Sequence, residues 1–300
     1  MIEDEIQMAE QYDILVIGPV SLDHNIDYLG NERKEVGGAV VASGFAAARS
    51  ENRTALFTKL NAKDVNIDEL FRDSGADLYW KKSSATCSIR NQYLSEDKEK
   101  RICTSMGVCD PFRFEEFADI PVRVYYFAGL VYGDFDGALF EKASHYGKVA
   151  VDVQCLLRHV EPDKTMAFYD WHEKLRYLPF VDYLKTDAAE AEILTGQTDR
   201  AEAAKMLYSW GAKEIVITHN TEVLAYDGTQ IYTCPIKARN LSGRTGRGDT
   251  TFAGYVTERQ RAGVSEALQY CTALVSLKME TPGPFRGSRE DVLDYIREFY

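Results

Sequence analysis

Asp13-Ile14-Leu15-Val16-Ile17-Gly18 is a short, uninterrupted apolar run that begins with an acid and ends at a glycine. An Ala-rich stretch from Gly37 to Ser50 follows and has the composition of a helix that packs closely against its neighbours. A second apolar run, Thr54-Ala55-Leu56-Phe57-Thr58, comes next. Continuous apolar strands separated by helices are typical of a parallel sheet that is covered on both faces. The stretch therefore predicts a β-α-β unit.

The same alternation continues along most of the chain. Further buried strands are expected at Val122 to Ala128, Val149 to Val153, Val181 to Leu184 and Ile215 to Thr218, with helical stretches between them. The pattern indicates an α/β fold in three layers, α/β/α, around a mostly parallel, doubly wound sheet. The sequence contains no internal repeat and no linker that would mark a second autonomous domain, so we expect one domain over residues 1–300.

Two segments, residues 23–36 and 83–104, break this rhythm because they are more polar and partly alternate as strands do. We expect them to form a small β-flap, or lid, over one edge of the main sheet. The alternative is that both are ordinary surface loops. Lys98-Glu99-Lys100-Arg101 is expected at a solvated hairpin tip.

Charge and cysteine content exclude several classes of protein. The chain has 300 residues, with 35 Lys and Arg against 47 Asp and Glu, so its net charge is −12. That field disfavours nucleic acid and anionic lipid as partners. No apolar run approaches the ~20 residues that span a bilayer, and Met1-Ile2-Glu3-Asp4-Glu5 is acidic where a signal peptide is basic. Six scattered cysteines without a Cys-x-x-Cys pair indicate reduced thiols in a cytoplasmic protein.

The chemistry is concentrated in Gly243-Arg244-Thr245-Gly246-Arg247-Gly248-Asp249-Thr250-Thr251-Phe252, a Gly-rich turn followed by an amphipathic helical pattern. Such a turn binds anions, because several amides and the positive end of the helix dipole converge there. It is not a Walker A loop, since Asp249 stands where that motif has Lys. A carboxylate beside an anion site is useful if it accepts the proton of an attacking hydroxyl. The alternative role for Asp249 is a plain helix N-cap.

Gly246-Arg247-Gly248-Asp249-Thr250-Thr251-Phe252 resembles the Gly-Ala-Gly-Asp signature of the PfkB/ribokinase family of sugar kinases. Three further segments resemble family motifs in the right order. They are Gly18-Pro19-Val20-Ser21-Leu22-Asp23, Gly37-Gly38 before the Ala-rich helix, and Lys185-Thr186-Asp187-Ala188-Ala189-Glu190 with Leu194-Thr195-Gly196. The resemblance extends from about residue 12 to the end of the chain.

The resemblance implies a ribokinase-like enzyme that phosphorylates an alcohol group of a sugar or polyol with ATP and Mg²⁺. Asp249 is then the catalytic base, and the amides of Gly246, Arg247 and Gly248 form the anion hole. The acceptor would be bound by Asp23, Gly37, Gly38 and Asp249. The metal would be held by Asp187 and Glu190, although acids in a first helical turn also simply complement the dipole.

The resemblance also implies a nucleotide site, made by Lys185, Asp187, Thr218, Asn220, Gly246 and Gly248. The base is expected between the segment Thr218 to Ile236 and the C-terminal helices near Val275 to Phe285.

The chain departs from the family pattern at several of these positions. Ala42 replaces an Asn that binds sugars in many relatives, and Arg247 stands where Ala is usual. His219-Asn220-Thr221-Glu222 replaces the nucleotide-side Gly-x-x-Gly. Asp187 stands where the family has Asn, and its extra charge would demand more metal or pair with Lys185.

Asp152-Val153-Gln154-Cys155-Leu156-Leu157-Arg158 resembles an Asp-x-Gln-Gly-x-x-Arg stretch of a subgroup that includes inositol-kinase-like proteins, which makes a cyclitol one candidate acceptor. In this stretch Arg158 would contact a phosphate or form a surface salt bridge.

Other functions stay open at this point. A nucleoside kinase of the same fold and a non-catalytic relative that binds a nucleotide or a sugar are the alternatives. A Rossmann dehydrogenase is excluded, because Gly18-Pro19-Val20-Ser21 lacks the Gly-x-Gly-x-x-Gly that should follow the first strand. We also expect a homodimer through the lid, since exposed strand edges are usually covered.

Overall fold

The computed structural model describes residues 11–95 and 101–300, and a nine-stranded sheet runs through its centre. The strand order is β15-β14-β13-β12-β9-β8-β1-β4-β5. Along the chain, the first six strands that belong to this sheet are β1 (Tyr12–Ile17), β4 (Thr54–Leu60), β5 (Asp77–Lys82), β8 (Val122–Phe127), β9 (Lys148–Asp152) and β12 (Tyr183–Asp187). They are followed by β13 (Ile215–Thr218), β14 (Glu222–Tyr226) and β15 (Ile231–Pro235). All pairs are parallel except β13 with β14 and β14 with β15. The predicted mostly parallel α/β sheet is confirmed.

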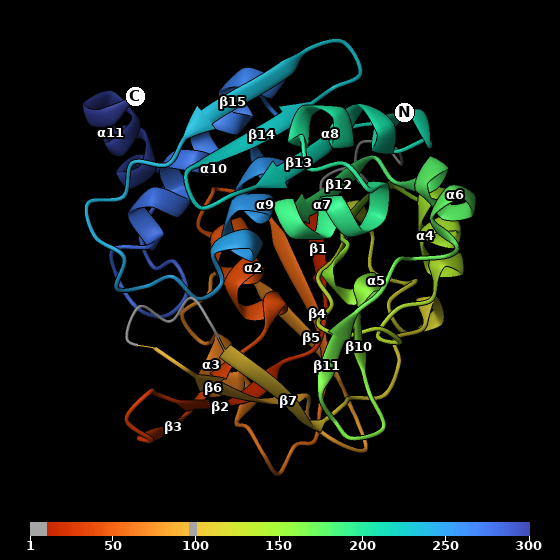
Figure 1. Cartoon of the computed structure of the whole chain (residues 1–300), viewed down its shortest axis with the longest axis vertical. Coiled ribbons are helices and arrows are strands. Elements are labelled where there is room, and N and C mark those ends of the chain that lie inside the picture. The colour runs from red at the N-terminus through yellow and green to blue at the C-terminus, as the bar shows by residue number, and fades with distance from the viewer. Residues whose placement is uncertain (1–10, 96–100) are drawn as a thin grey trace.

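Helices cover both faces of this sheet. One face carries α2 (Ala39–Ala48), α3 (Ile67–Phe71), α9 (Arg247–Glu258), α10 (Val264–Lys278) and α11 (Arg289–Phe299). The other carries α4 (Gly137–Ser144), α5 (Gln154–Leu157), α6 (Lys174–Tyr177), α7 (Ala188–Thr195) and α8 (Arg200–Ser209). In Figure 1, α4 and α6 lie to the right of the sheet and α10 and α11 to the left. The fold is the three-layer α/β/α arrangement.

The central strand β1 shows why the apolar runs lack a polar alternation. Ile14 and Val16 belong to the core on the α2 and α9 side, whereas Leu15 and Ile17 belong to the core on the α4 side. All four side chains are fully buried. Because successive strand residues point to opposite faces, a strand covered on both faces must be apolar at every position.

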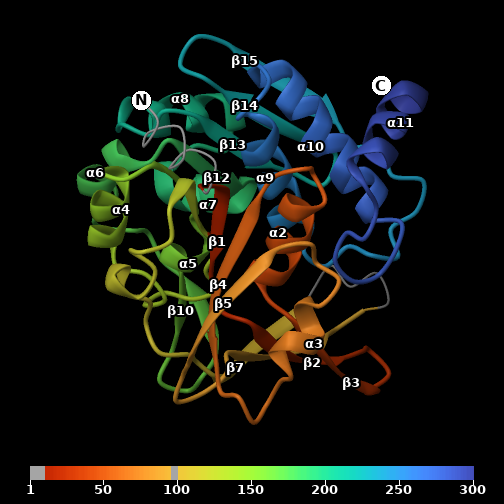
Figure 2. The ribbon, with the colours of Figure 1, turned by 180° about the vertical axis from the view of Figure 1, so that it is seen from behind.

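The two polar segments form a separate four-stranded sheet, which we call the lid. It contains β3 (Glu32–Gly37), β2 (Ser21–Ile26), β6 (Ser88–Tyr93) and β7 (Arg101–Gly107), in that order. The predicted flap is confirmed, and the surface-loop alternative is wrong. Figure 2, seen from behind, shows the lid at the bottom of the molecule and β13 to β15 at the top. A small hairpin, β10 (Arg158–Val160) and β11 (Met166–Phe168), meets the lid where the Ser105 amide donates to the Lys164 carbonyl at 2.8 Å.

Some expectations fall elsewhere or need correction. Lys98 to Lys100 of the expected hairpin tip and the acidic residues 1–5 lie outside the described residues. The predicted strand at 181–184 begins two residues later, because Leu178–Phe180 forms a 3-10 turn that ends at Val181. Among the described residues no helix has the length and apolarity needed to cross a bilayer.

Candidate active site

The carboxyl ends of three neighbouring strands bring polar residues together at one edge of the main sheet. Lys185 of β12 lies opposite Asp152 of β9, and Asp187 lies opposite Thr218 of β13. The helix α9 begins beside these strand ends, where the Lys185 ammonium approaches Gly248. Ligands of open α/β sheets bind at this edge, so the arrangement marks the candidate site.

Two glycines, Gly246 and Gly248, lie at the start of α9. Gly246 is the N-cap residue and has a left-handed φ of 76°, which favours glycine. A Cβ at this position would also lie 2.9 Å from the Cβ of Ala42 in α2. Asp249 is the third helical residue and not the cap, so the plain N-cap interpretation is wrong. The first amides of α9 therefore have no side chain capping them from Gly246.

Lys185 is the central cation of the site. Its buried ammonium donates to both carboxylate oxygens of Asp152, at 3.1 and 3.0 Å, and lies 3.7 Å from a Glu190 oxygen. Burial alone would lower its pKa, but the two carboxylates outweigh burial and raise the pKa well above the usual value. A Cβ at Gly248 would lie 3.2 Å from this ammonium, so glycine lets the lysine approach the helix end closely.

Asp249 has the electrostatics of a group poised to exchange a proton near neutrality. Burial, followed by the like charge of Asp152, raises the pKa of its carboxyl to about 6. The cations Lys185, Arg158 and Lys278 oppose that rise. At pH 7 the carboxylate form predominates, which is the form that can accept a proton.

Asp187 and Glu190 form a capping box at the start of α7. The Glu190 amide donates to Asp187 Oδ1 at 2.8 Å, and the Asp187 amide donates to Glu190 Oε2 at 2.7 Å. Burial raises the pKa of Glu190 to about 7. The structure thus gives both acids the helix-start role. An ion pair between Asp187 and Lys185 was one expectation. It is wrong, because Lys185 forms its ion pairs with Asp152 and Glu190.

The predicted acceptor residues lie where the lid joins the main sheet. Asp23 is in β2, where the Ser21 hydroxyl donates to it, and burial raises the pKa of its carboxyl. Gly38 is the N-cap of α2 with φ of 106°, and a Cβ there would lie 2.6 Å from the Pro19 carbonyl oxygen. Gly37 ends β3, and no atom lies within 4 Å of where its Cβ would be. The lid edge is open at Gly37.

Arg158 connects the lid residue with the α9 residue. Burial raises the pKa of both Asp23 and Asp249, and the charge of Arg158 acts on both carboxyls in the opposite direction. Its side chain is 7% exposed, and Nε donates to the Leu130 carbonyl at 2.7 Å. The surface salt bridge considered for Arg158 is therefore wrong. The guanidinium is a buried charge that acts on two candidate functional acids.

The two predicted nucleotide-side residues at the carboxyl end of β13 differ in burial. Thr218 is buried, and its hydroxyl lies 3.4 Å from the Thr186 carbonyl oxygen, to which it donates. Asn220 is exposed in the tight turn between β13 and β14, which the His219 amide closes by donating to the Glu222 carbonyl at 3.0 Å. His219 Nδ1 lies 2.9 Å from the Thr221 hydroxyl, so this histidine has a local partner.

Two buried charges at the site were not predicted. The Lys278 ammonium donates to the carbonyls of Gly243 and Thr245, and burial lowers its pKa to about 8. Asp134 accepts from the amides of Leu130 and Val131 at 2.7 and 3.0 Å, and burial raises its pKa to about 6. The one available signal for Lys278 was a lysine at the end of an apolar helical run.

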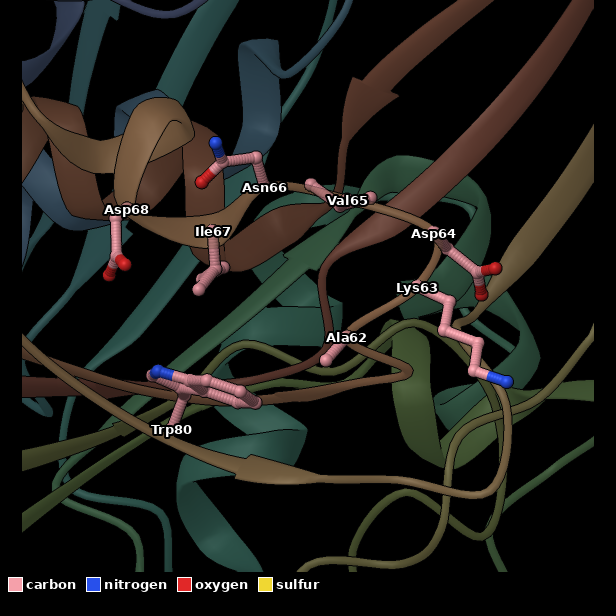
Figure 3. Close-up of a pocket in the computed structure, with 8 residues that line it drawn as sticks. All are labelled: Ala62, Lys63, Asp64, Val65, Asn66, Ile67, Asp68 and Trp80. Carbon is pink, nitrogen blue, oxygen red and sulfur yellow. The ribbon is translucent and has the colours of Figure 1, made fainter.

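A hollow of about 370 Å³ lies elsewhere, between the loop after β4, the start of α3 and Trp80 of β5. Figure 3 shows the Trp80 indole below Ile67, with Lys63 and Asp64 directed away from it. None of the residues of the carboxyl edge lines this hollow.

Comparisons with known proteins identify the family and agree with the fold. A model of the pfkB family carbohydrate kinases matches residues 11–290. A pyrophosphate-dependent kinase in the ribokinase family, solved with a pyrophosphate analog and myo-inositol, is 32% identical, with 94% of this chain and 99% of that one covered and a TM-score of 0.85. A pyrophosphate-dependent myo-inositol-1 kinase, converted by mutation into a myo-inositol-3 kinase, is also 32% identical, with 95% and 98% covered and a TM-score of 0.84.

More distant relatives share the fold or part of the sequence. Arabidopsis thaliana ribokinase, solved with ribose and ATP, has a TM-score of 0.75 at 14% identity over 96% of this chain and 99% of that one. A cytidine kinase from Thermococcus kodakarensis is 26% identical over 281 residues, which are 87% of this chain and 92% of the relative. The chain belongs to the PfkB family of carbohydrate kinases and is a sugar or polyol kinase.

Proposed function

We propose that this kinase transfers a phosphoryl group to a hydroxyl of a cyclitol such as myo-inositol, with Asp249 as the base. The observation that carries the proposal is that the charge of one buried arginine, Arg158, acts on the carboxyls of both Asp23 and Asp249. A lid acid and a helix-start acid that respond to one buried cation support a common site. Relatives that are 32% identical are myo-inositol kinases or bind myo-inositol, which supports the choice of acceptor.

Asp249 would take the proton of the attacking hydroxyl. Its pKa of about 6 lies close to neutrality, which suits a general base. The amides of Gly246, Arg247 and Gly248 stand at the positive end of α9, and would stabilise the charge on the transferred phosphoryl group. By analogy with oxyanion holes, each amide that points at the developing charge stabilises the transition state by about 3–4 kcal/mol.

The acceptor would be held by Asp23, Gly37 and Gly38. A carboxylate accepts hydrogen bonds from two adjacent ring hydroxyls, and the open position beside Gly37 leaves room for a polyol. Ala42 packs against Gly246, so α2 offers no polar side chain there. Recognition of the acceptor would depend on the lid.

Asp187 and Glu190 fit a hydrated Mg²⁺. Each carboxylate uses one oxygen in the capping box, Oδ1 and Oε2, and keeps the other. In the described part of the chain no cluster of three or more His, Cys, Asp or Glu could hold a metal alone. Mg²⁺ commonly uses one or two carboxylates, waters and substrate phosphates, so two acids suffice. When bound, the metal would neutralise charge on the donor phosphates.

The donor would bind with its phosphates at Gly246 and Gly248, near Lys185, Asp187 and Thr218. ATP is the donor that the family resemblance predicts, with Asn220 on the nucleotide side. Pyrophosphate is the donor named for three solved structures at 32% identity, and is the second candidate.

A nucleoside is the second candidate acceptor, because a cytidine kinase is 26% identical to this chain. A non-catalytic sugar- or nucleotide-binding relative is the remaining alternative. The experiment is product formation with Mg²⁺ and either donor across inositols, hexoses, pentoses and nucleosides, with Asp249→Asn as control. Inositol phosphate that disappears in the variant supports the proposal. A larger rate with a nucleoside contradicts the cyclitol, and no product with any pair favours the non-catalytic relative.

A homodimer through the lid and a cytoplasmic location are further proposals. The lid strands and their turn expose Tyr28, Leu29, Val36, Ile102 and Met106, and a covered edge would bury them. All six cysteines are free thiols, as expected in a reducing compartment. Light scattering at micromolar concentration tests the dimer, and a mass of 33.9 kDa would contradict it.

A further inference from the structure

A nucleotide base was expected between the segment that ends at Ile236 and the C-terminal helices near Val275 to Phe285. Side chains of the protein occupy this space, which we call the base interval. The Tyr300 hydroxyl donates to the Pro235 carbonyl at 2.8 Å and lies 3.0 Å from the Ser276 hydroxyl. The Lys237 ammonium lies 4.5 Å from the centre of the Tyr300 ring. Burial raises the pKa of this tyrosine to about 12. An aromatic ring of the protein thus lies between the end of β15 and α10.

A second set of side chains fills the space beside Tyr300. Arg239 and Glu280 form an ion pair, with Nε donating to Oε1 at 2.8 Å. The Tyr295 hydroxyl lies 2.9 Å from both the Lys237 carbonyl and Glu280 Oε1. The Arg239 guanidinium also lies 5.4 Å from the centre of the Tyr295 ring. These residues join the segment after β15 to α11 and to the end of α10.

Backbone contacts close the same interval further towards the phosphate loop. The Lys237 amide donates to the Ser276 hydroxyl at 3.0 Å, and the Gly243 amide donates to the Met279 carbonyl at 2.7 Å. A Cβ at Gly243 would lie 1.8 Å from the Thr281 carbonyl oxygen. These contacts hold the two segments together at Ser276, Met279 and Thr281, so a planar base cannot stack between them there.

The phosphate end of the site, in contrast, is rich in cations. Arg244 and Arg247 flank Thr245 and Gly246 in the loop, and Lys278 and Lys185 lie beside it. A donor without a base must obtain its affinity from its phosphates alone. Arginine and lysine side chains and helix-start amides provide that affinity through charge-assisted hydrogen bonds.

We propose that the phosphoryl donor is inorganic pyrophosphate and not a nucleoside triphosphate. This inference rests on the proposed function, because it names the donor of the same site. The alcohol oxygen forms a bond to one phosphorus, and the bond from that phosphorus to the bridging oxygen breaks. Orthophosphate leaves with the bonding electron pair, and the alcohol proton passes to Asp249 and then to solvent or orthophosphate. No oxidant or reductant is needed.

The test compares donors in the intact protein with myo-inositol and Mg²⁺. Formation of inositol phosphate is measured by ³¹P NMR with pyrophosphate, ATP or GTP. We expect kcat/KM for pyrophosphate to exceed that for ATP by about 100-fold or more. An equal or larger value for ATP would overturn the inference while leaving the proposed kinase intact. Absence of product with every donor and acceptor would instead overturn the proposed function on which the inference rests.

Tyr300→Ala tests whether the occupied interval causes the preference. Removing the ring opens space next to Ser276 without touching the phosphate loop. We expect kcat/KM for pyrophosphate to stay within about twofold and that for ATP to rise about tenfold. The matched control is Tyr146→Ala, which removes a 66% exposed ring that stacks on Phe114 in the other core, and neither donor should respond. An unchanged ATP rate in a folded Tyr300→Ala protein would contradict the assigned cause, and the wild-type comparison stands if the variant does not fold.

Discussion

The carboxyl edge around Lys185 and the lid around Asp23 differ in the burial of their residues. At the carboxyl edge Lys185, Asp152 and Glu190 are buried and form ion pairs, and Gly248 lets Lys185 approach α9 closely. In the lid, five of the six residues of β3 are exposed. The proposed reaction chemistry would thus take place in the buried part of the molecule. The proposed choice of acceptor would depend on the lid, whose strand β3 is largely exposed.

The carboxyl edge carries a cost in stability. Asp249 and Glu190 have pKa values of about 6 and about 7, raised chiefly by burial. A raised acid pKa means that the folded protein binds the proton more tightly than the unfolded chain. The contribution to stability is therefore favourable only at low pH, and falls as the pH rises from the unfolded value through the folded one. At neutral pH these acids destabilise the fold that needs them.

Asp249→Asn should give the largest effect. The amide cannot accept the hydroxyl proton, so turnover should fall by about 10²–10⁴-fold. Because the substitution removes a disfavoured charge, the protein should become more stable by about 1–3 kcal/mol at pH 7. Steady-state kinetics and urea unfolding measure the two changes. Asp68→Asn, at an exposed carboxylate of α3, is the control and should change neither. Turnover near that of the wild type would eliminate Asp249 as the base.

Lys185→Met should give the largest loss of stability. Methionine matches the lysine stem but leaves Asp152 and Glu190 buried without their cation. Breaking a buried pair in this way costs about 3–5 kcal/mol. The control is Lys205→Met, which breaks an exposed pair with Glu202 and should cost less than about 1 kcal/mol. Equal unfolding midpoints for the two variants in urea would show that burial adds nothing to this ion pair.

The contrast between the two regions also explains what the sequence could predict. Strands covered on both faces were visible as apolar runs, and the lid was visible as a loss of that pattern. Three strands of the main sheet were not predicted, β5 at one edge and β14 and β15 at the other. In β5, Asp77 to Lys82 is largely exposed and carries three charges. A strand at the rim of a sheet has no need of an apolar sequence.

Within the site, glycines and Asp249 were predictable because a turn that opens a helix has a local signature. Lys278 and Asp134 were not, because a single charged residue reveals its burial only after distant segments come together. The filling of the base interval was missed for the same reason. Tyr300 meets Pro235 across 65 residues of sequence, and no local pattern reports that contact.

The pH dependence of the reaction should report the protonation of Asp249 at the carboxyl edge. With the base at a pKa of about 6, kcat/KM should be level near pH 7 to 8 and fall about tenfold for each pH unit below 6. Measurement from pH 4.5 to 8, with circular dichroism at each pH, distinguishes protonation from unfolding. A profile that stays level down to pH 5 would contradict both the raised pKa and the role of Asp249.

Asp23→Asn should give the smallest effect, and of a different kind. The lid acid binds hydroxyls in the ground state and the transition state alike, so its loss removes uniform binding. We expect KM for the acceptor to rise about tenfold, or about 1.4 kcal/mol, with kcat within about twofold. The control is Asp27→Asn, in the same lid, where the carboxylate accepts from Leu29 and Asn31 and should leave KM unchanged. If kcat falls as steeply in Asp23→Asn as in Asp249→Asn, the acid of the lid takes part in the chemical step. The separation of acceptor choice from catalysis would then not hold, because one charge would serve both through the shared field of Arg158.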